Sequence, residues 1–234
     1  MSIIATKNVT KTYGKGEAAF TALDDVSLSV IAGETVAILG KSGSGKSTLM
    51  HTLALLDRPS KGSVSVNDEN VSKLKGKKLD SLRNKSFGFV FQQFFLNGID
   101  SVLNNVILPL KIAKVGRRER KARALAVLAA VDLKDKAKVK AANLSGGQKQ
   151  RVCIARALIN NPEIIFADEP TGNLDSVTGK MIVDLLFKLN AEKKITLIIV
   201  THDIDLARRC QRQLLIKDGR LINHPTRQAE ARVI

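Results

Sequence analysis

Residues 40–47 read Gly40-Lys41-Ser42-Gly43-Ser44-Gly45-Lys46-Ser47, which fits the pattern G-x-x-x-x-G-K-[ST] of a phosphate-binding loop. An apolar run at residues 36–39 precedes the loop and predicts a strand, and apolar residues from Leu49 to Leu56 follow it at helical spacing. Glycines let backbone N–H groups turn onto phosphate oxygens, and the helix dipole adds partial positive charge there. The stretch therefore predicts a site for the phosphates of a nucleoside triphosphate.

Two side chains of this loop have expected roles of their own. Lys46 would reach the β- and γ-phosphates, and the Ser47 hydroxyl would be a ligand of Mg²⁺. The alternative is a chance turn rich in glycine and serine. All four fixed positions of the pattern are filled and both flanks fit, which favours the phosphate site.

A second apolar run, residues 164–167, ends in the acids Asp168 and Glu169 and is closed by Pro170. In enzymes with a phosphate-binding loop, acids at such a strand end manage Mg²⁺ and the attacking water. Asp168 would hold Mg²⁺ through water, and Glu169 would orient or deprotonate the attacking water. A polar strand edge without function is the alternative, and the upstream loop disfavours it.

The string Leu144-Ser145-Gly146-Gly147-Gln148 predicts the start of a helix. Ser145 and Gln148 have the spacing of a capping box, in which each side chain bonds the other's backbone N–H. The two glycines are poor helix formers and leave the backbone N–H groups bare, which indicates a second anion site. A plain helix cap is the alternative.

Three further positions are ambiguous from the residues alone. Tyr13, in an expected polar loop, could stack on a base or lie in a surface turn. Gln92 closes the apolar strand 87–91 and could face a metal–phosphate centre or only solvent. His202 follows the apolar strand 196–200, where the ligand sites of parallel sheets gather, although a lone histidine is usually structural.

Length and composition favour one globular domain, or one domain with a subdomain: the chain has 234 residues and 44% hydrophobic content. No apolar run approaches the roughly 18 residues of a membrane helix, and we expect no signal peptide at the N-terminus. Cys153 and Cys210 are far apart and predict small buried side chains in a reducing compartment.

The net charge is +16, and residues 111–151 contain 13 Lys or Arg against three acids. Such a field attracts nucleic acid or anionic lipid headgroups, although a solvated face of a basic protein is the alternative.

Elsewhere the pattern predicts strands at 2–9, 26–30 and 61–66 with a turn at 67–68, a helical segment at 74–83, helices at 102–114, 118–131 and 178–190, a basic connector at 134–142, a hairpin at 214–222 and a polar tail at 223–234.

In this order and spacing the motifs resemble an ABC-type ATPase domain over nearly the whole chain. The matching pieces are Tyr13, residues 40–48, Gln92, residues 144–148, residues 164–169, Asn173-Leu174-Asp175 and His202, and the Leu-Ser-Gly-Gly-Gln string is highly specific to that family. The resemblance implies an α/β fold of the P-loop NTPase class with a RecA-like core. It also implies an N-terminal antiparallel β-subdomain and a helical subdomain near 93–160, within one domain over 1–234.

The resemblance further implies ATP and Mg²⁺ as cofactors and a head-to-tail homodimer in the ATP-bound state. Asp175 would cross that dimer and link its two sites. Residues implied to bind the nucleotide are Tyr13, which would stack on adenine, Gly40, Lys41, Ser42, Gly43, Ser44, Gly45, Lys46, Ser47, Thr48 and, from the second copy, Ser145, Gly146, Gly147 and Gln148. Ser47, Gln92 and Asp168 would serve the metal, and Glu169, His202 and Gln92 would serve hydrolysis.

A closer resemblance is to the macrolide-export and lipoprotein-releasing group (MacB/LolD type), carried by residues 42–50, 56–59, 89–92 and 167–176. It implies a subunit bound peripherally at the cytoplasmic face of the cell membrane, which powers a separate integral membrane permease for a peptide, lipoprotein or drug-like cargo. The sequence departs from the group at residues 94–98, at Asn104, before Leu144 and at residues 209–212.

Two other functions stay open. A soluble ATPase of the same superfamily could act on nucleic acid, although such translation factors carry two domains and such repair proteins carry long coiled coils. The chain could also regulate cell-wall hydrolysis through a permease-like partner. Phe94-Phe95-Leu96, just after Gln92, predicts an exposed contact with a membrane partner and makes nucleic acid the less favoured partner.

Overall fold

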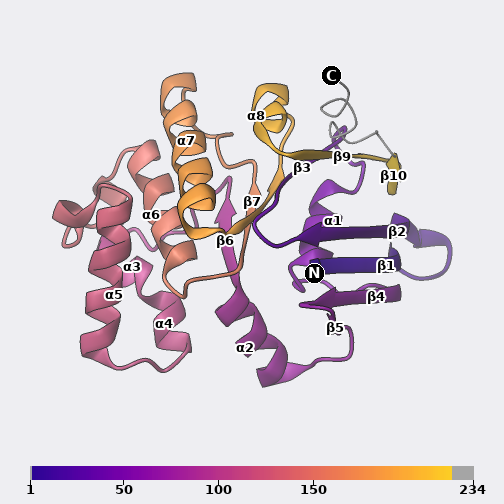
Figure 1. Cartoon of the computed structure of the whole chain (residues 1–234), viewed down its shortest axis with the longest axis horizontal. Coiled ribbons are helices and arrows are strands. Elements are labelled where there is room, and N and C mark those ends of the chain that lie inside the picture. The colour runs from indigo at the N-terminus through magenta and orange to yellow at the C-terminus, as the bar shows by residue number, and fades with distance from the viewer. Residues whose placement is uncertain (1, 223–234) are drawn as a thin grey trace, which may run out of the picture. The chain divides into compact units, whose positions relative to one another are not determined.

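A computed structural model describes residues 2–222 of the chain (Figure 1). The chain divides into two compact units: unit 1 comprises residues 1–79 and 196–234, and unit 2 comprises residues 80–195. The chain passes from unit 1 into unit 2 within helix α2 (Gly76–Ser86). The predicted polar tail, 223–234, lies outside the described residues.

Unit 1 contains a four-stranded antiparallel sheet in the order β2 (Phe20–Ile31), β1 (Ser2–Tyr13), β4 (Lys61–Val66) and β5 (Glu69–Asn70), on the right in Figure 1. The short 3₁₀ turn η1 (Gly16–Ala18) joins β1 to β2. The prediction of a strand at 61–66 followed by a turn is confirmed: β4 has these bounds, and Asn67 and Asp68 in the turn both have positive φ. The bounds predicted for β1 and β2 were too short, because their outer parts mix polar and apolar residues and pair with register shifts.

The second sheet of unit 1 runs in the order β10 (Arg220–Ile222), β9 (Arg212–Lys217), β3 (Thr35–Leu39) and β8 (Thr196–Val200). Strand β3 is parallel to both β8 and β9, and all five residues of β8 are buried. Continuous apolar runs are typical of such two-sided burial. The predicted hairpin is confirmed: β9 and β10 pair antiparallel around Asp218 and Gly219, both at positive φ.

Two helices of unit 1 follow the ends of these parallel strands. Helix α1 (Lys46–Leu53) starts in the loop after β3 and buries Leu49, Met50 and Leu53. Helix α8 (Ile204–Arg209) follows β8 and is capped by Asp203, whose side chain accepts the N–H groups of residues 205 and 206. Both helix starts thus lie at the carboxyl edge of this sheet.

Unit 2 is built on the parallel pair β6 (Phe87–Phe91) and β7 (Ile164–Asp168). Phe87 packs edge-on against Phe166 at 5.3 Å between ring centroids, and Phe89 stacks on the same ring at 5.8 Å. Helices α6 (Gly146–Leu158) and α7 (Ser176–Lys193) belong to this unit, and α6 packs on β6. A Cβ on Gly88 would lie 2.7 Å from the Ala157 carbonyl oxygen, so only glycine allows that close approach.

The remaining helices of unit 2, α3 (Val102–Val106), α4 (Leu108–Ile112) and α5 (Arg117–Ala130), gather with α6 on the left of Figure 1. Two 3₁₀ turns, η2 (Lys134–Lys136) and η3 (Ala141–Asn143), occupy the predicted connector. The prediction of one helix over 102–114 was wrong. Pro109 has no N–H to donate, and the chain starts a new helix there, with Ile107 ending α3 and capping α4.

Cys153 and Cys210 are both buried, as predicted. Burial raises the pKa of the Cys153 thiol to about 11 and that of the Cys210 thiol to about 12, so both stay neutral near pH 7. Among residues 2–222, no helix combines the length and the apolar character that crossing a membrane requires.

Candidate functional site

The phosphate-binding loop follows the carboxyl end of β3 and leads into α1, as the sequence predicts. Gly40 and Gly45 have φ of +157° and +106°. A Cβ on Gly40 would lie 2.3 Å from the Ile216 carbonyl oxygen, and one on Gly45 would lie 2.5 Å from that of Ala22. Glycine is therefore required at both positions, by the approach of β9 and β2 respectively.

Lys46 folds back over its own loop. Its Nζ donates to the carbonyl oxygens of Gly40 and Lys41, each at 2.9 Å. In the part of the chain that the structure describes, the buried Ser44 hydroxyl has no hydrogen-bond partner. A buried polar atom without a partner is rare and costly, so a ligand oxygen at this loop fits the residues present.

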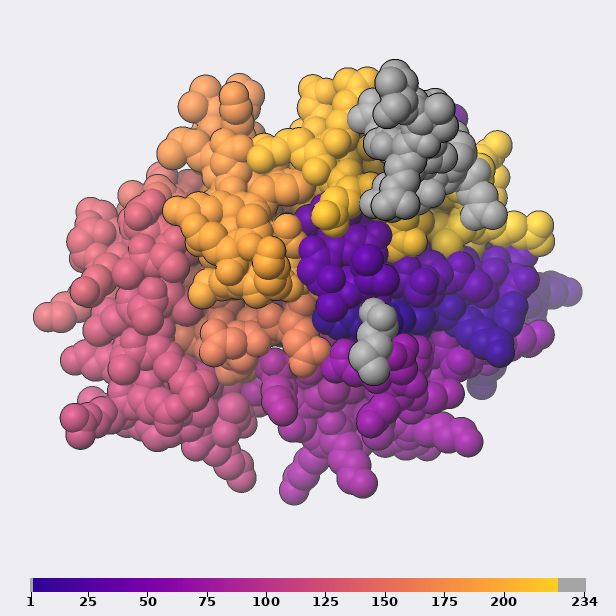
Figure 2. Space-filling model, viewed as in Figure 1, coloured from indigo at the N-terminus to yellow at the C-terminus, as the bar shows by residue number. Residues whose placement is uncertain are grey.

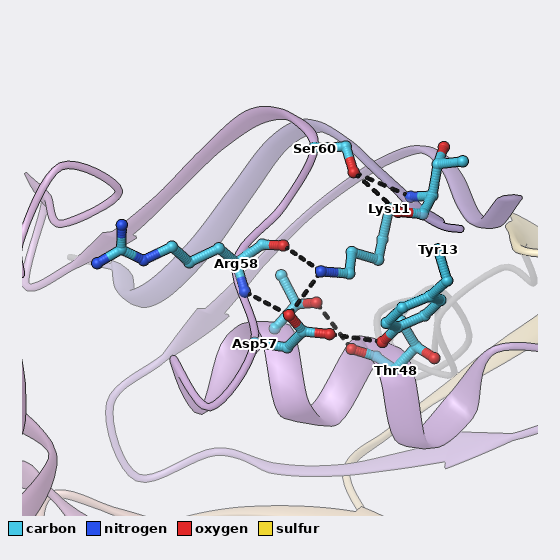
Figure 3. Close-up of polar contacts among 8 residues, drawn as sticks. Lys11, Tyr13, Thr48, Asp57, Arg58 and Ser60 are labelled. Carbon is cyan, nitrogen blue, oxygen red and sulfur yellow. Dashed lines mark hydrogen bonds and ion pairs between the residues drawn. The ribbon is translucent and has the colours of Figure 1, made fainter. Parts of the chain in front are cut away.

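Tyr13 does not lie in a loop, contrary to the expectation. It is the last residue of β1 and pairs with Phe20 of β2. Its hydroxyl donates to Asp57 at 2.5 Å, and Lys11 Nζ donates to the same carboxylate at 2.5 Å (Figure 3). Burial and the hydrogen bond to Asp57 raise the pKa of Tyr13.

His202 lies at the same edge of the sheet as the phosphate loop. Strands β3 and β8 are parallel with Ile38 opposite Val200, so His202 and Gly40 stand at matching positions beyond the two strand ends. The Thr201 N–H donates to the Ile38 carbonyl oxygen at 3.3 Å, which holds the carboxyl ends of the two strands together. The structure therefore places the exposed His202 beside the loop, as expected for a phosphate contact.

In unit 2, Gln92 and the acids share one edge of the sheet. Phe91 of β6 is opposite Asp168 of β7, so Gln92 and Glu169 follow at matching positions. Asn173 donates to the Gln92 carbonyl oxygen at 2.8 Å. A Cβ on Gly172 would lie 2.7 Å from Gln92 Nε2, so the loop after β7 closes onto this glutamine.

Glu169 has φ of +43°, a left-handed conformation that is strained for a residue with a full side chain. The Gly172 N–H donates to its carbonyl oxygen at 3.0 Å. The next residue, Pro170, is buried, and its oxygen accepts Gln150 Nε2 at 2.6 Å. These two bonds fix the backbone from the glutamate onward.

The capping box at the start of α6 is confirmed. Ser145 Oγ accepts the Gln148 N–H at 3.4 Å, and Gln148 Oε1 accepts the Ser145 N–H at 3.1 Å. A Cβ on Gly147 would lie 2.4 Å from Thr178 Cγ2 on α7. The glycine therefore lets this helix start pack against the first turn of α7.

Asp175 caps α7: its carboxylate accepts the Thr178 N–H at 2.9 Å. Hydrogen bonds from Thr178 lower the pKa of this exposed carboxyl. Asp175 thus has a role within its own unit, in addition to the one implied by the resemblance.

Sequence reasoning missed four residues that support the site. Lys11 and Asp57 bond around Tyr13, Asn173 holds Gln92, and the buried Gln150 joins α6 to the ends of β6 and β7. Gln150 carries a readable signal, because a long amide within an apolar helix face needs a polar partner. The other three act through contacts that only the fold creates.

The candidate metal donors are all oxygens: the Ser47 hydroxyl in unit 1, and the Asp168 carboxylate and the Gln92 amide oxygen in unit 2. Oxygen ligands of this kind suit Mg²⁺, which keeps several waters and is usually shared with phosphates. Within residues 2–222, no group of three or more His, Cys, Asp or Glu side chains could hold a metal ion. In each unit the chemistry of these donors therefore fits Mg²⁺.

Comparison with known proteins agrees with this chemistry. Residues 23–172 match the family model for the ABC transporter. The chain is 43% identical to the lipoprotein-releasing system ATP-binding protein LolD of Wigglesworthia glossinidia brevipalpis, over 94% of this chain and 96% of that one. It is 48% identical to the macrolide export ATP-binding/permease protein MacB of Burkholderia pseudomallei, over 92% of this chain and 33% of that longer protein.

A solved structure gives the same result for the fold. The ATP-binding cassette MJ0796 of Methanocaldococcus jannaschii, described as a dimer in a post-hydrolysis state bound to ADP and Pi, superposes with a TM-score of 0.86. It is 46% identical and covers 95% of this chain and 98% of its own. The predicted α/β fold of the P-loop NTPase class is thereby confirmed, and the chain belongs to the ABC transporter family as an ATP-binding ATPase.

Proposed function

We propose that the chain is the ATPase subunit that powers a separate integral membrane permease, for export or extraction of a peptide, lipoprotein or drug-like cargo. The observation that carries this proposal is the match, along nearly their whole lengths, to the lipoprotein-releasing ATP-binding protein. Relatives of similar identity include a methionine import ATP-binding protein of Latilactobacillus sakei, at 46%. The cargo therefore has to be tested with the permease.

The roles proposed for the chain's own residues rest on the resemblance and are supported by their positions. Lys46 and the backbone N–H groups of its loop bind the phosphates, and Tyr13 stacks on adenine. Glu169, in its fixed left-handed conformation, holds and deprotonates the attacking water. Ser47, Asp168 and Gln92 would each serve Mg²⁺, which when bound would supply positive charge to the phosphates. His202, beside the phosphate loop, holds the γ-phosphate.

The second phosphate contact comes from another copy of the chain. Ser145, Gly146, Gly147 and Gln148 present a capped helix start to the γ-phosphate bound by the partner, in a head-to-tail homodimer. The dimeric M. jannaschii cassette supports this arrangement. ATP binding favours the closed dimer, and hydrolysis allows the two copies to separate. Because the closed dimer binds ATP more tightly than the separated copies do, ATP drives the conformational change that is transmitted to the permease.

The chain works as one domain over residues 1–234, with a helical subdomain near 93–160 that contacts the permease. Phe95 supports this proposal. This residue is 64% exposed, and its backbone φ is +45°. Phe94 and Leu96 are partly buried, so the exposed run expected here is reduced to one aromatic ring. Arg156 donates to the Phe95 oxygen at 2.7 Å, and Phe91 packs edge-on against its ring at 5.5 Å.

An exposed aromatic ring that is held in place is suited to a partner surface. We therefore propose peripheral attachment at the cytoplasmic face of the membrane through the permease. Phe95→Ala is expected to leave ATP hydrolysis by the isolated chain unchanged and to abolish co-purification with membranes that contain the permease. Ile31→Ala removes a side chain of similar exposure from β2 and is the matched control.

The basic segment 111–151 favours a second candidate, an ATPase acting on nucleic acid. Most of its Lys and Arg side chains are exposed, and α5, which carries many of them, lies at the surface of unit 2 in the pink part of Figure 2. That function predicts binding that falls steeply with salt and a several-fold stimulation of hydrolysis by RNA or DNA. Stimulation together with unchanged membrane association of Phe95→Ala would replace the transporter function with this one.

A further inference from the structure

A closed polar cluster lies behind Tyr13 in unit 1 (Figure 3). The Tyr13 hydroxyl donates to Asp57 Oδ2, and Lys11 Nζ donates to Asp57 Oδ1, both at 2.5 Å. Lys11 Nζ also donates to the Arg58 carbonyl oxygen at 2.8 Å. Asp57 thus binds the only tyrosine of the chain and a lysine through its two carboxylate oxygens.

Asp57 is itself fixed to the helix that begins in the phosphate loop. Its N–H donates to the His51 carbonyl oxygen of α1 at 3.1 Å, and its Oδ1 accepts the Arg58 N–H at 2.8 Å. Helix α1 therefore carries the phosphate loop at its start and the anchor of Tyr13 just beyond its end.

The two faces of the Tyr13 ring are not equivalent. Lys11 Nζ lies over the ring, 4.7 Å from its centroid, in the geometry of a cation–π contact. The residue is 41% exposed, so ring surface remains open to a ligand. A base that stacks on this tyrosine has to use the face opposite Lys11.

The protonation states suit the cluster at neutral pH. Burial acts to raise the pKa of Asp57, but hydrogen bonds from Lys11 and Tyr13 outweigh it and hold the pKa of Asp57 below its usual value. Burial and the bond to Asp57 raise the pKa of Tyr13, so that its hydroxyl stays a donor. The acceptor is charged and the donor is protonated.

We propose that Asp57 and Lys11 are positioning residues for base recognition: they hold the Tyr13 ring at a fixed place and leave one face for the adenine of ATP. The inference rests on the proposed function, in which Tyr13 stacks on the base. An exposed tyrosine that is free to rotate loses side-chain entropy when a base binds, whereas this ring is ordered beforehand. The tether therefore contributes to affinity for the base and leaves the phosphate contacts unchanged.

Tyr13→Phe is the sharpest test, because it keeps the ring and removes only the hydroxyl, which bonds Asp57 and also interacts with the Thr48 side chain. The purified full-length chain is titrated with ATP and, separately, with inorganic tripolyphosphate, which can occupy the phosphate loop and has no base. We expect the Kd for ATP to rise about three- to tenfold, as for the loss of one hydrogen bond, and the Kd for tripolyphosphate to stay unchanged. In steady state, KM for ATP rises and kcat does not.

Variants of the anchor complete the design. Asp57→Ala is expected to weaken ATP binding at least as much as Tyr13→Phe. The variant that combines both substitutions should bind ATP no more weakly than Asp57→Ala, because the two substitutions remove the same interaction. Asp57→Asn keeps an acceptor for the tyrosine hydroxyl and recovers part of the affinity. Asp80→Ala, which removes an exposed ion pair with Arg83 on α2, is the control and leaves both affinities unchanged.

The outcomes separate this inference from the proposed function. If Tyr13→Ala weakens ATP binding while Tyr13→Phe binds like the wild type, stacking holds and the tether is overturned. If Tyr13→Ala itself binds ATP like the wild type, the stacking role fails, and the inference fails with it. A parallel loss of ATP and tripolyphosphate affinity in Asp57→Ala would show that the cluster supports the phosphate loop and would overturn the positioning role.

Discussion

The neighbours of Glu169 fix the backbone conformation in which this residue would serve its proposed role. Its left-handed backbone is strained, and the bonds at Gly172 and Pro170 hold it in that conformation. Strain of this kind costs on the order of 1–3 kcal/mol and persists only where the surrounding structure enforces it.

The substitution Glu169→Gln tests this role. The amide keeps the size of the side chain and loses the base, so we expect ATP binding to persist and kcat to fall about 100-fold or more. Phosphate release and nucleotide binding are measured side by side. Glu163→Gln, which changes an exposed acid just before the other end of β7, is the control. Turnover near the wild-type rate in Glu169→Gln would remove this residue from the base role.

Among the elements, the contact between the start of α6 and the first turn of α7 is unusually close. A Cβ added at Gly147 would lie 2.4 Å from Thr178 Cγ2. A Cβ added at Gly146 would lie 3.3 Å from the flexible end of the Leu174 side chain. Helix propensity alone favours alanine over glycine by about 1 kcal/mol. Propensity and packing therefore predict opposite effects at residue 147.

We expect packing to dominate in Gly147→Ala, with a loss of stability of about 1–3 kcal/mol and a loss of hydrolysis. Thermal unfolding and phosphate release are the measurements. Thr178→Ser removes the clashing methyl and keeps the hydroxyl, so the double variant should recover both properties, and Gly146→Ala should be milder. A higher melting temperature in Gly147→Ala, with normal turnover, would contradict the prediction.

The elements also show what the sequence alone can predict. Strands β6, β7 and β8 were placed correctly because buried parallel strands are continuous apolar runs. The outer parts of β1 and β2 were missed because polar and apolar residues do not alternate regularly there, and register shifts interrupt their pairing. The phosphate loop and the capping box are local patterns and could be found.

The tether of Tyr13 could not be found in this way, because Lys11 and Asp57 are 46 residues apart and meet only through the fold. The same holds for the bond between Gln92 and Asn173, which lie 81 residues apart. A motif predicts a residue and its chemistry, whereas the residue that positions it is set by tertiary structure.

For the whole molecule, the proposed homodimer makes a prediction about mass. The helix start at Ser145 is exposed in the single chain, and its ligand would be supplied by a second copy. We expect the wild type to be mainly monomeric and Glu169→Gln to dimerise with ATP, because the trapped nucleotide links two copies. Light scattering with and without ATP measures this. An unchanged mass at high protein concentration would contradict the shared site.

The division of the chain into one continuous and one discontinuous unit has a consequence for synthesis. Unit 2 is a single segment and can begin to fold as soon as it leaves the ribosome. Strand β3, which carries the phosphate loop, has β8 and β9 as its neighbours, and both come from the last part of the chain. A nascent chain that ends before residue 196 therefore presents its phosphate-binding loop on an unpaired strand, and the ability to bind ATP emerges only after β8 and β9 have been synthesised.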